Sequence, residues 1–147
     1  MSNETAVVLR QEQDFRFAIS FGENIPVLHG DEAPPLGAGT GPTPVQLLAA
    51  AVGNCLSDSL YFALRKFKQD AQGITTHVTY SVGRNAEGRL RVLKMNVEVR
   101  LGAPAATIEH LDRVLSQFEG FCTVAQSVGQ GIPIDVAVLD GAGVKIK

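Results

Sequence analysis

The longest apolar stretch of the chain, Thr43–Phe67, predicts one long helix. Thr43 suits the N-cap, Pro44 suits the first helical position, and Gln46 completes a T-x-x-Q capping box. The first half of the stretch is apolar nearly all the way round, which is typical of a helix buried in a larger structure. We expect it to be too short for a membrane span, and too interrupted, by Gly53, Asn54, Ser57 and Asp58.

Alternating apolar and polar residues ahead of this helix predict an antiparallel meander. The clearest alternation is Phe15–Phe21, with shorter strands expected at Thr5–Gln11 and Ile25–His29. A loop rich in glycine and proline, residues 30–42, then leads to the helix. Its glycines do not match a nucleotide-binding pattern, because Pro42 stands where a dinucleotide fingerprint needs glycine and no Lys-Ser/Thr pair precedes the helix.

Two alternating stretches after the helix, Ile74–Val82 and Arg89–Leu101, predict a hairpin. The apolar phase of the second strand slips by one residue at Val92–Leu93, which indicates a β-bulge. We therefore expect a long pair of strands whose other face is solvated.

Two helices and a strand complete the predicted order. The first helix is expected over Ala106–Glu119, with Thr107 as its cap and Gly120 as its break. A short helix over Phe121–Val128 and a strand over Ile132–Leu139 follow. Since no βαβ repeat dominates, the order predicts an α+β fold with a mainly antiparallel sheet packed on a long central helix. A length of 147 residues favours a single domain over residues 1–147.

Composition narrows the possible partners. The net charge is −2 and no basic patch is present, which argues against nucleic acid as a partner. The first residues lack the basic and apolar regions of a signal peptide, so we expect a cytoplasmic protein without a membrane partner. Cysteines in a reducing compartment are more often catalytic, redox-active or metal-binding than structural.

The chain has two cysteines, Cys55 and Cys122, and both fall in predicted helices. Either could simply be a small buried apolar residue. Cys122 lies in the first turn of its helix, where the dipole favours a thiolate. Asn54 and Asp58 flank Cys55 and indicate a small polar pocket around it, in which a nearby arginine would be needed to stabilise a thiolate.

The distance between the cysteines along the chain excludes a CxxC motif. A peroxidatic and resolving pair does not need such proximity, because one thiol is oxidised to sulfenic acid and a second thiol from anywhere in the fold condenses with it. A metal site made of both cysteines and His29 would have to join three distant segments, so we expect no metal and no cofactor. His77 and His110 lie on polar faces of their elements and are expected to be exposed.

The run GPTPVQLLAAAVGNCLSDSL, the meander before it and the later FCTVAQSV resemble the OsmC/Ohr family of osmotically inducible and organic hydroperoxide resistance proteins. The resemblance covers about Phe15 to Leu139. It implies an intertwined homodimer in which the long helix is buried between sheets and the active sites lie at the interface. It also implies that Cys55 attacks an organic hydroperoxide held in an apolar pocket, that Cys122 resolves the product, and that a dithiol reduces the resulting disulfide.

One position departs from the peroxidatic members, which carry a glutamate directly after the proline at the helix start. Val45 stands there in this chain. That glutamate holds a catalytic arginine from the meander, for which Arg16 is the first candidate and Arg10 the next. Arg16 has the alternative interpretation of an exposed strand residue. The loop carboxylates Asp31 and Glu32 are either a replacement for the glutamate or simply solvated.

Two functions are therefore compatible with the sequence. The first is thiol-dependent reduction of organic hydroperoxides in oxidative-stress defence. The alternative is a dimer of the same fold without peroxidase activity, which binds an apolar small molecule or has only a stress-related role.

Overall fold

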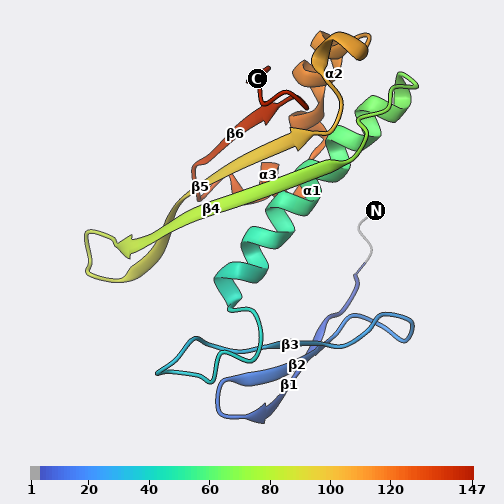
Figure 1. Cartoon of the computed structure of the whole chain (residues 1–147). Coiled ribbons are helices and arrows are strands. Elements are labelled where there is room, and N and C mark those ends of the chain that lie inside the picture. The colour runs from blue at the N-terminus through green and yellow to red at the C-terminus, as the bar shows by residue number, and fades with distance from the viewer. Residues whose placement is uncertain (1–3) are drawn as a thin grey trace. The chain divides into compact units, whose positions relative to one another are not determined.

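The chain forms two compact units, and the computed structural model describes residues 4–147 (Figure 1). The first unit ends at Leu48 and the second comprises Ala49–Lys147. The helix α1, Pro44–Lys66, begins in the first unit and continues in the second. Each unit is described by itself below.

The first unit is built on a three-stranded antiparallel sheet in the order β1-β2-β3, which confirms the predicted meander. Its strands are β1 Val8–Gln13, β2 Arg16–Ser20 and β3 Leu28–Gly30, shifted by up to three residues from the predicted bounds. Side chains alternate along a strand, so Phe17 and Ile19 lie on one face of β2 and Arg16 on the other.

The predicted capping box forms at the start of α1. The amide of Thr43 donates to Oε1 of Gln46 at 2.9 Å, and the amide of Gln46 donates to Oγ1 of Thr43 at 3.2 Å. Two amides that have no partner inside the helix are thereby satisfied. This local exchange explains why the helix begins where the sequence predicts it.

The second unit contains a long antiparallel hairpin of β4, Ile74–Arg84, and β5, Leu90–Leu101. Val82 pairs with Val92 whereas Ser81 pairs with Lys94, so Leu93 is the extra residue of a bulge. The bulge lies at the position where the apolar phase of the sequence slips. The prediction of a solvated face is confirmed by the exposure of the alternate residues of β5.

The third strand of this sheet, β6 Ile134–Leu139, pairs with β5 in parallel. The strand pairings within residues 4–147 are mainly antiparallel, as predicted, because only the pairing of β5 with β6 is parallel. These residues form two separate three-stranded sheets, and the sequence did not indicate that the second sheet is mixed. The physical reason is the connection: the helical segment between β5 and β6 carries the chain back to the end at which β5 began, and a strand that starts there can only run parallel.

The connection between β5 and β6 contains more and shorter helical segments than the sequence predicts. It consists of a 3₁₀ turn Ala105–Thr107, the helix α2 Leu111–Gln117, a second 3₁₀ turn Phe118–Phe121 and the helix α3 Thr123–Val128. The predicted start of the helix at 106 is wrong because His110 adopts a left-handed conformation, with φ of 59°. The predicted cap by Thr107 is wrong too, since its hydroxyl donates to the carbonyl of Pro104.

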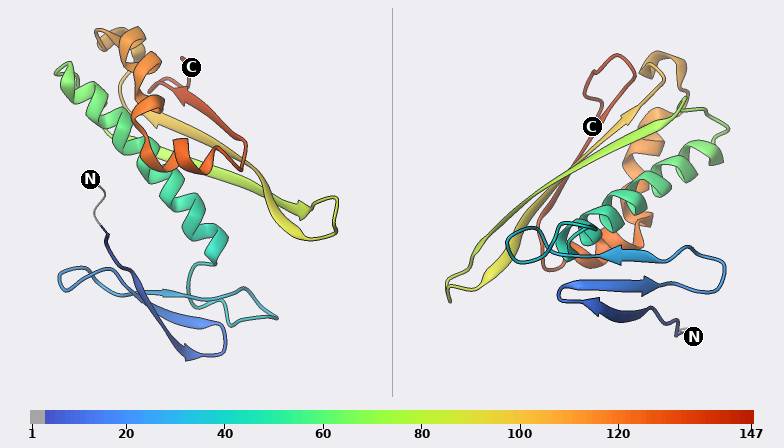
Figure 2. Two further views of the ribbon diagram at one scale, coloured as in Figure 1. Left: turned by 180° about the vertical axis from the view of Figure 1, so that it is seen from behind. Right: turned by 60° about the horizontal axis from the view of Figure 1, so that its bottom comes forward.

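One face of α1 is buried and the opposite one is exposed. The buried residues follow a spacing of three and four: Ala49, Val52, Gly53, Leu56, Ser59, Leu60, Ala63 and Leu64. Ala50 and Ala51 are exposed, so the expectation of burial all round is wrong for the single chain. In its second-unit part the helix lies on the same face of the β4-β5-β6 sheet as α2 and α3 (Figures 1 and 2).

The helix approaches β4 closely at Gly53. A Cβ at this position would lie 2.6 Å from Cγ2 of Val78. Four residues further on, the hydroxyls of Ser57 and Thr76 are 2.6 Å apart and hydrogen-bonded.

The helix α1 is long and apolar enough to cross a membrane by length and composition alone. The expectation that it is too short for a span is therefore corrected. A buried core helix meets the same two criteria.

Candidate functional site

The two cysteines meet in the second unit although they are far apart in the sequence. Cys55 lies on α1, and Cys122 lies at the start of α3. Both are free thiols, and Cys55 lies close enough to Cys122 to raise the pKa of the Cys122 thiol. The geometry thereby brings together the two residues that the sequence singled out.

The two thiols differ in accessibility. Cys55 is half-buried, whereas Cys122 has no exposed surface. A small oxidant can reach only an accessible sulfur, so this difference distinguishes an attacking thiol from one that reacts inside the protein.

The environment of Cys122 disfavours its thiolate. Burial, followed by the hydrogen bond to the Cys55 thiol, raises the pKa of Cys122 to about 11. The amide of Ala125 donates to its sulfur at 3.4 Å and opposes this shift only in part. The predicted thiolate at the helix start is therefore wrong, because Cys122 is the N-cap rather than a first-turn residue and is fully buried there.

The polar neighbours of Cys55 also differ from the prediction. The side-chain amide of Asn54 donates to Oδ2 of Asp58 at 3.0 Å. Both residues are exposed, so they do not form a pocket around the thiol. A polar side chain that lies nearer to the thiols is Ser59, which is buried and weakly opposes the rise in the pKa of Cys122. Ser59 lies one helical turn after Cys55, so the spacing along the helix could have indicated it.

A cavity of about 200 Å³ lies in the same unit, and residues next to the thiols, but neither cysteine itself, line it. Its wall includes Leu56, which follows Cys55 in the chain, and Ala125, whose amide donates to the sulfur of Cys122. The other lining residues come from the helical connection and β6: Glu119, Gln126, Gly129, Gln130, Ile134 and Val136.

Arg16, the predicted catalytic arginine, belongs to the first unit and is firmly held there. Its Nε donates to Oε1 of Glu12 at 3.0 Å, and its Nη1 donates to the hydroxyl of Thr40 at 2.7 Å. About a third of its side chain is exposed, so Arg16 is a half-buried residue of β2. Glu12, the carboxylate that Arg16 contacts, also lies 3.4 Å from Nε2 of His29.

Asp31 organises the glycine-rich loop. It is buried and accepts hydrogen bonds from the amides of Glu32, Ala38 and Thr40, and from the hydroxyl of Thr40 at 2.8 Å. The contacts from Thr40, reinforced by the other two amides, hold the pKa of this carboxyl below its usual range. Asp31 therefore supports Arg16 through Thr40, and the expectation that it is simply solvated is wrong.

An apolar cavity of about 240 Å³ lies in the first unit, on the Phe17 face of β2. Apolar side chains from the sheet and from the start of α1 line most of it: Leu9, Phe15, Phe17, Ile19, Pro42, Pro44 and Leu47. Asp31 and Glu32 lie at its edge. A cavity of this composition suits an apolar group and offers few polar partners.

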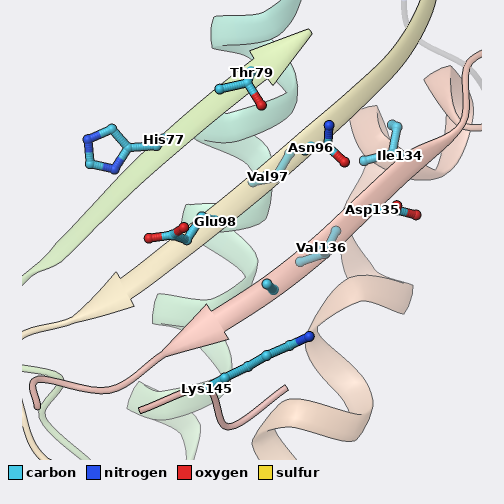
Figure 3. Close-up of a pocket in the computed structure, with 10 residues that line it drawn as sticks. His77, Thr79, Asn96, Val97, Glu98, Ile134, Asp135, Val136 and Lys145 are labelled. Carbon is cyan, nitrogen blue, oxygen red and sulfur yellow. The ribbon is translucent and has the colours of Figure 1, made fainter. Parts of the chain in front are cut away.

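A hollow of about 470 Å³ lies on the second sheet over the face that carries His77 and Glu98 (Figure 3). Lys94 and Asp135 form an ion pair of 2.7 Å close to it. Neither cysteine lines this hollow, so we place the candidate site at the thiols instead. His77 and His110 are exposed, as predicted. Within residues 4–147, no three side chains of His, Cys, Asp or Glu come together as a metal site would require.

Comparison with known proteins finds one matching family and several solved structures of similar fold. The family model of OsmC-like proteins matches residues 37–137. No protein of curated function is significantly similar in sequence. The structures nevertheless agree over almost the whole chain.

An OsmC-like protein of unknown function from Vibrio cholerae has a TM-score of 0.78 at 15% identity, covering 94% of this chain and 100% of that chain. An organic hydroperoxide resistance protein OsmC from Legionella pneumophila has a TM-score of 0.71 at 11% identity, with coverages of 93% and 98%. The organic hydroperoxide resistance protein OhrB of Bacillus subtilis has a TM-score of 0.67 at 14% identity, with coverages of 92% and 98%. At these identities the likeness concerns the fold.

Proposed function

Because the chain belongs to the OsmC family, we propose that it is a thiol-dependent reductase of organic hydroperoxides with a role in oxidative-stress defence. The observation that carries this proposal is the contact between a half-buried Cys55 and a fully buried Cys122. Relatives of the same fold include organic hydroperoxide resistance proteins, which supports the stress-related role.

The proposed reaction has three steps. The thiolate of Cys55 attacks the terminal oxygen of the hydroperoxide, the O–O bond breaks, and the products are the alcohol and a sulfenic acid on Cys55. The thiol of Cys122 then attacks the Cys55 sulfur, which forms the disulfide and releases water. A small dithiol reduces the disulfide and becomes a cyclic disulfide itself.

Thiol titration tests this function. After one equivalent of cumene hydroperoxide, the native chain is expected to lose two titratable thiols, because both sulfurs end in the disulfide. Cys55→Ser should lose none, and Cys122→Ser should hold a sulfenic acid on Cys55 that dimedone labels. Survival of both thiols in excess hydroperoxide would falsify the proposal.

Arg16 is proposed to take part in the oxidation step. Its guanidinium is fixed by Glu12 and Thr40, as a group that stabilises negative charge must be. Arg16→Ala is expected to slow the oxidation of Cys55 by about tenfold or more, because the negative charge in the reaction loses a fixed positive partner. Stopped-flow measurement with Arg10→Ala as the control checks this. Equal rates for Arg16→Ala and the native chain would leave Arg16 with a structural role only.

We also propose a homodimer. The α1 face opposite to the sheet exposes Tyr61 and Phe62 at 57% and 62%, which is unusual for large apolar side chains on an isolated chain. A second copy that covers this face would bury the long helix between sheets. Sedimentation equilibrium should therefore give about twice the 15.6 kDa of one chain. A stable mass of a single chain contradicts the dimer.

A binding function without peroxidase activity is the second candidate, and the apolar cavity around Phe17 favours it. In that case the thiols survive hydroperoxide while an apolar fluorescent probe such as 1-anilinonaphthalene-8-sulfonate is bound and displaced by fatty acids. A cytoplasmic location belongs to either candidate as an expectation.

A further inference from the structure

Residues 140–147 fold back along β6 within the second unit, and we call them the C-terminal strap. Leu139 and Lys145 form an antiparallel bridge. The amide of Ile146 donates to the carbonyl of Val138 at 2.8 Å, and the amide of Val138 donates to the carbonyl of Lys147 at 3.0 Å. The strap is therefore held to β6 by backbone hydrogen bonds, like an added strand.

The carboxylate of Asp140 fixes the turn at the start of the strap. It is buried and accepts hydrogen bonds from the amides of Ala142 at 3.0 Å and Val144 at 2.9 Å. The amide of Ala105 donates to the same carboxylate at 2.9 Å, from the first 3₁₀ turn of the connection between β5 and β6. The strap is thus tied at its beginning to the connection that leads to Cys122.

The side chain of Lys147 ties the other part of the strap to the same connection. Its ammonium group donates to the carbonyl of Leu115 at 2.6 Å, in the last turn of α2, where a cation is favoured by the helix dipole. It also forms an ion pair with the carboxylate of Glu119 and lies 5.1 Å from the centre of the Phe118 ring. One cation is therefore fixed by a carbonyl, a carboxylate and an aromatic face.

The residues that Lys147 contacts also position the buried thiol. The carbonyl of Glu119 accepts a hydrogen bond from the amide of Cys122 at 3.2 Å and another from the side-chain amide of Gln126 at 3.0 Å. Phe118 begins the 3₁₀ turn that ends directly before Cys122, and neither of these two residues has any exposed surface. A displacement of this turn would consequently uncover the sulfur of Cys122.

We propose that the contacts of Lys147 hold the turn Phe118–Phe121 in place and keep Cys122 out of solvent, so that a reagent in solution reaches Cys55 first. The order of oxidation rests on the proposed function, in which Cys122 must still be a thiol when Cys55 has become a sulfenic acid. Direct oxidation of Cys122 would remove that thiol. Lys147 is a positioning residue in this scheme, because it acts through the turn and touches neither sulfur.

The exposure of Cys122 can be measured in Cys55→Ser, where Cys122 is the one remaining thiol. The rate of alkylation by N-ethylmaleimide is followed by mass spectrometry. Adding Lys147→Ala is expected to accelerate it by about tenfold or more, because a hydrogen bond and an ion pair of a charged group are lost. Lys147→Arg keeps the charge and should restore slow alkylation. Lys145→Ala is the matched control, since that lysine lines the hollow over His77 and Glu98 instead.

Unchanged alkylation in Lys147→Ala overturns the proposal, and so does an equal acceleration in Lys145→Ala or Lys147→Arg. Circular dichroism checks that each variant is folded. Salt gives a second test that needs no change at Lys147, because about a third of each side chain in its ion pair with Glu119 is exposed. Molar sodium chloride should accelerate alkylation of Cys55→Ser and leave Cys55→Ser/Lys147→Ala unchanged. Equal salt effects on both would contradict the part assigned to the ion pair.

A further arm separates this inference from the proposed function. Cumene hydroperoxide replaces the maleimide, and dimedone then detects sulfenic acid. We expect no sulfenic acid on Cys122 in Cys55→Ser and a detectable amount after Lys147→Ala is added. If cumene hydroperoxide also fails to oxidise Cys55 in the native chain, the proposed function fails, whereas the alkylation rates still decide whether Lys147 keeps Cys122 buried.

Discussion

Phe118→Ala is expected to lower the free energy of unfolding by about 3–5 kcal/mol, the cost of removing a large buried side chain and leaving a cavity. Phe118 has no exposed surface and lies four residues before Cys122. The ammonium group of Lys147 lies 5.1 Å from the centre of its ring and donates to the carbonyl of Leu115 at 2.6 Å. This side chain therefore anchors the segment that carries the buried thiol. Urea unfolding followed by circular dichroism measures the change.

Phe121→Ala is the matched control for this substitution. Phe121 belongs to the same 3₁₀ turn but is 62% exposed, so its truncation should change the free energy of unfolding by no more than about 0.5 kcal/mol. Equal losses for the two variants would contradict the burial of Phe118. The contrast is useful because the two residues have the same type and lie three positions apart.

Gly102→Ala is expected to cost about 2–4 kcal/mol, because overpacking against backbone cannot be relieved by rotating a side chain. A Cβ at Gly102 would collide with the carbonyl oxygen of Gln72. Relief of that collision would separate the amide of Gly102 from the Gly73 carbonyl, at 2.9 Å, and the amide of Ala103 from the Ala71 carbonyl, at 2.7 Å. These bonds join the end of β5 to the connection after α1.

Gly120→Ala provides the control for the glycine substitution. A Cβ at Gly120 meets no atom within 4 Å, so alanine should be tolerated or slightly stabilising there. Urea unfolding of both variants compares them directly. A Gly102→Ala chain that is as stable as Gly120→Ala would show that the end of β5 can move without cost.

The site illustrates how geometry separates two residues that look equivalent in the sequence. Each cysteine lies in or beside a helix, and the helix dipole favours a thiolate at the one nearer a helix start. In the folded chain that residue, Cys122, is buried and its pKa is raised, whereas Cys55 retains access to solvent. Desolvation outweighs the single amide that donates to Cys122.

Local rules were sufficient for several elements. The capping box of Thr43 and Gln46, the bulge at Leu93 and the N-terminal meander all depend on residues that are near one another in the chain or on a strict period of two. The P-x-x-L-L-x-A-x-x-x-x-C run from Pro44 to Cys55 likewise resembles the OsmC family, and the family match over residues 37–137 confirms this prediction.

Other features depend on contacts between distant segments, and no local pattern contains them. The parallel pairing of β6 follows from where the chain returns after its helical connection, and the start of α2 follows from the left-handed His110. Thr40 meets Arg16 only because folding brings the glycine-rich loop to β2. The residues of Thr43–Phe67 are sufficient to predict the long helix, its start and the thiol on it. Which thiol is accessible follows from the folded chain alone, because burial depends on every segment that packs around a sulfur.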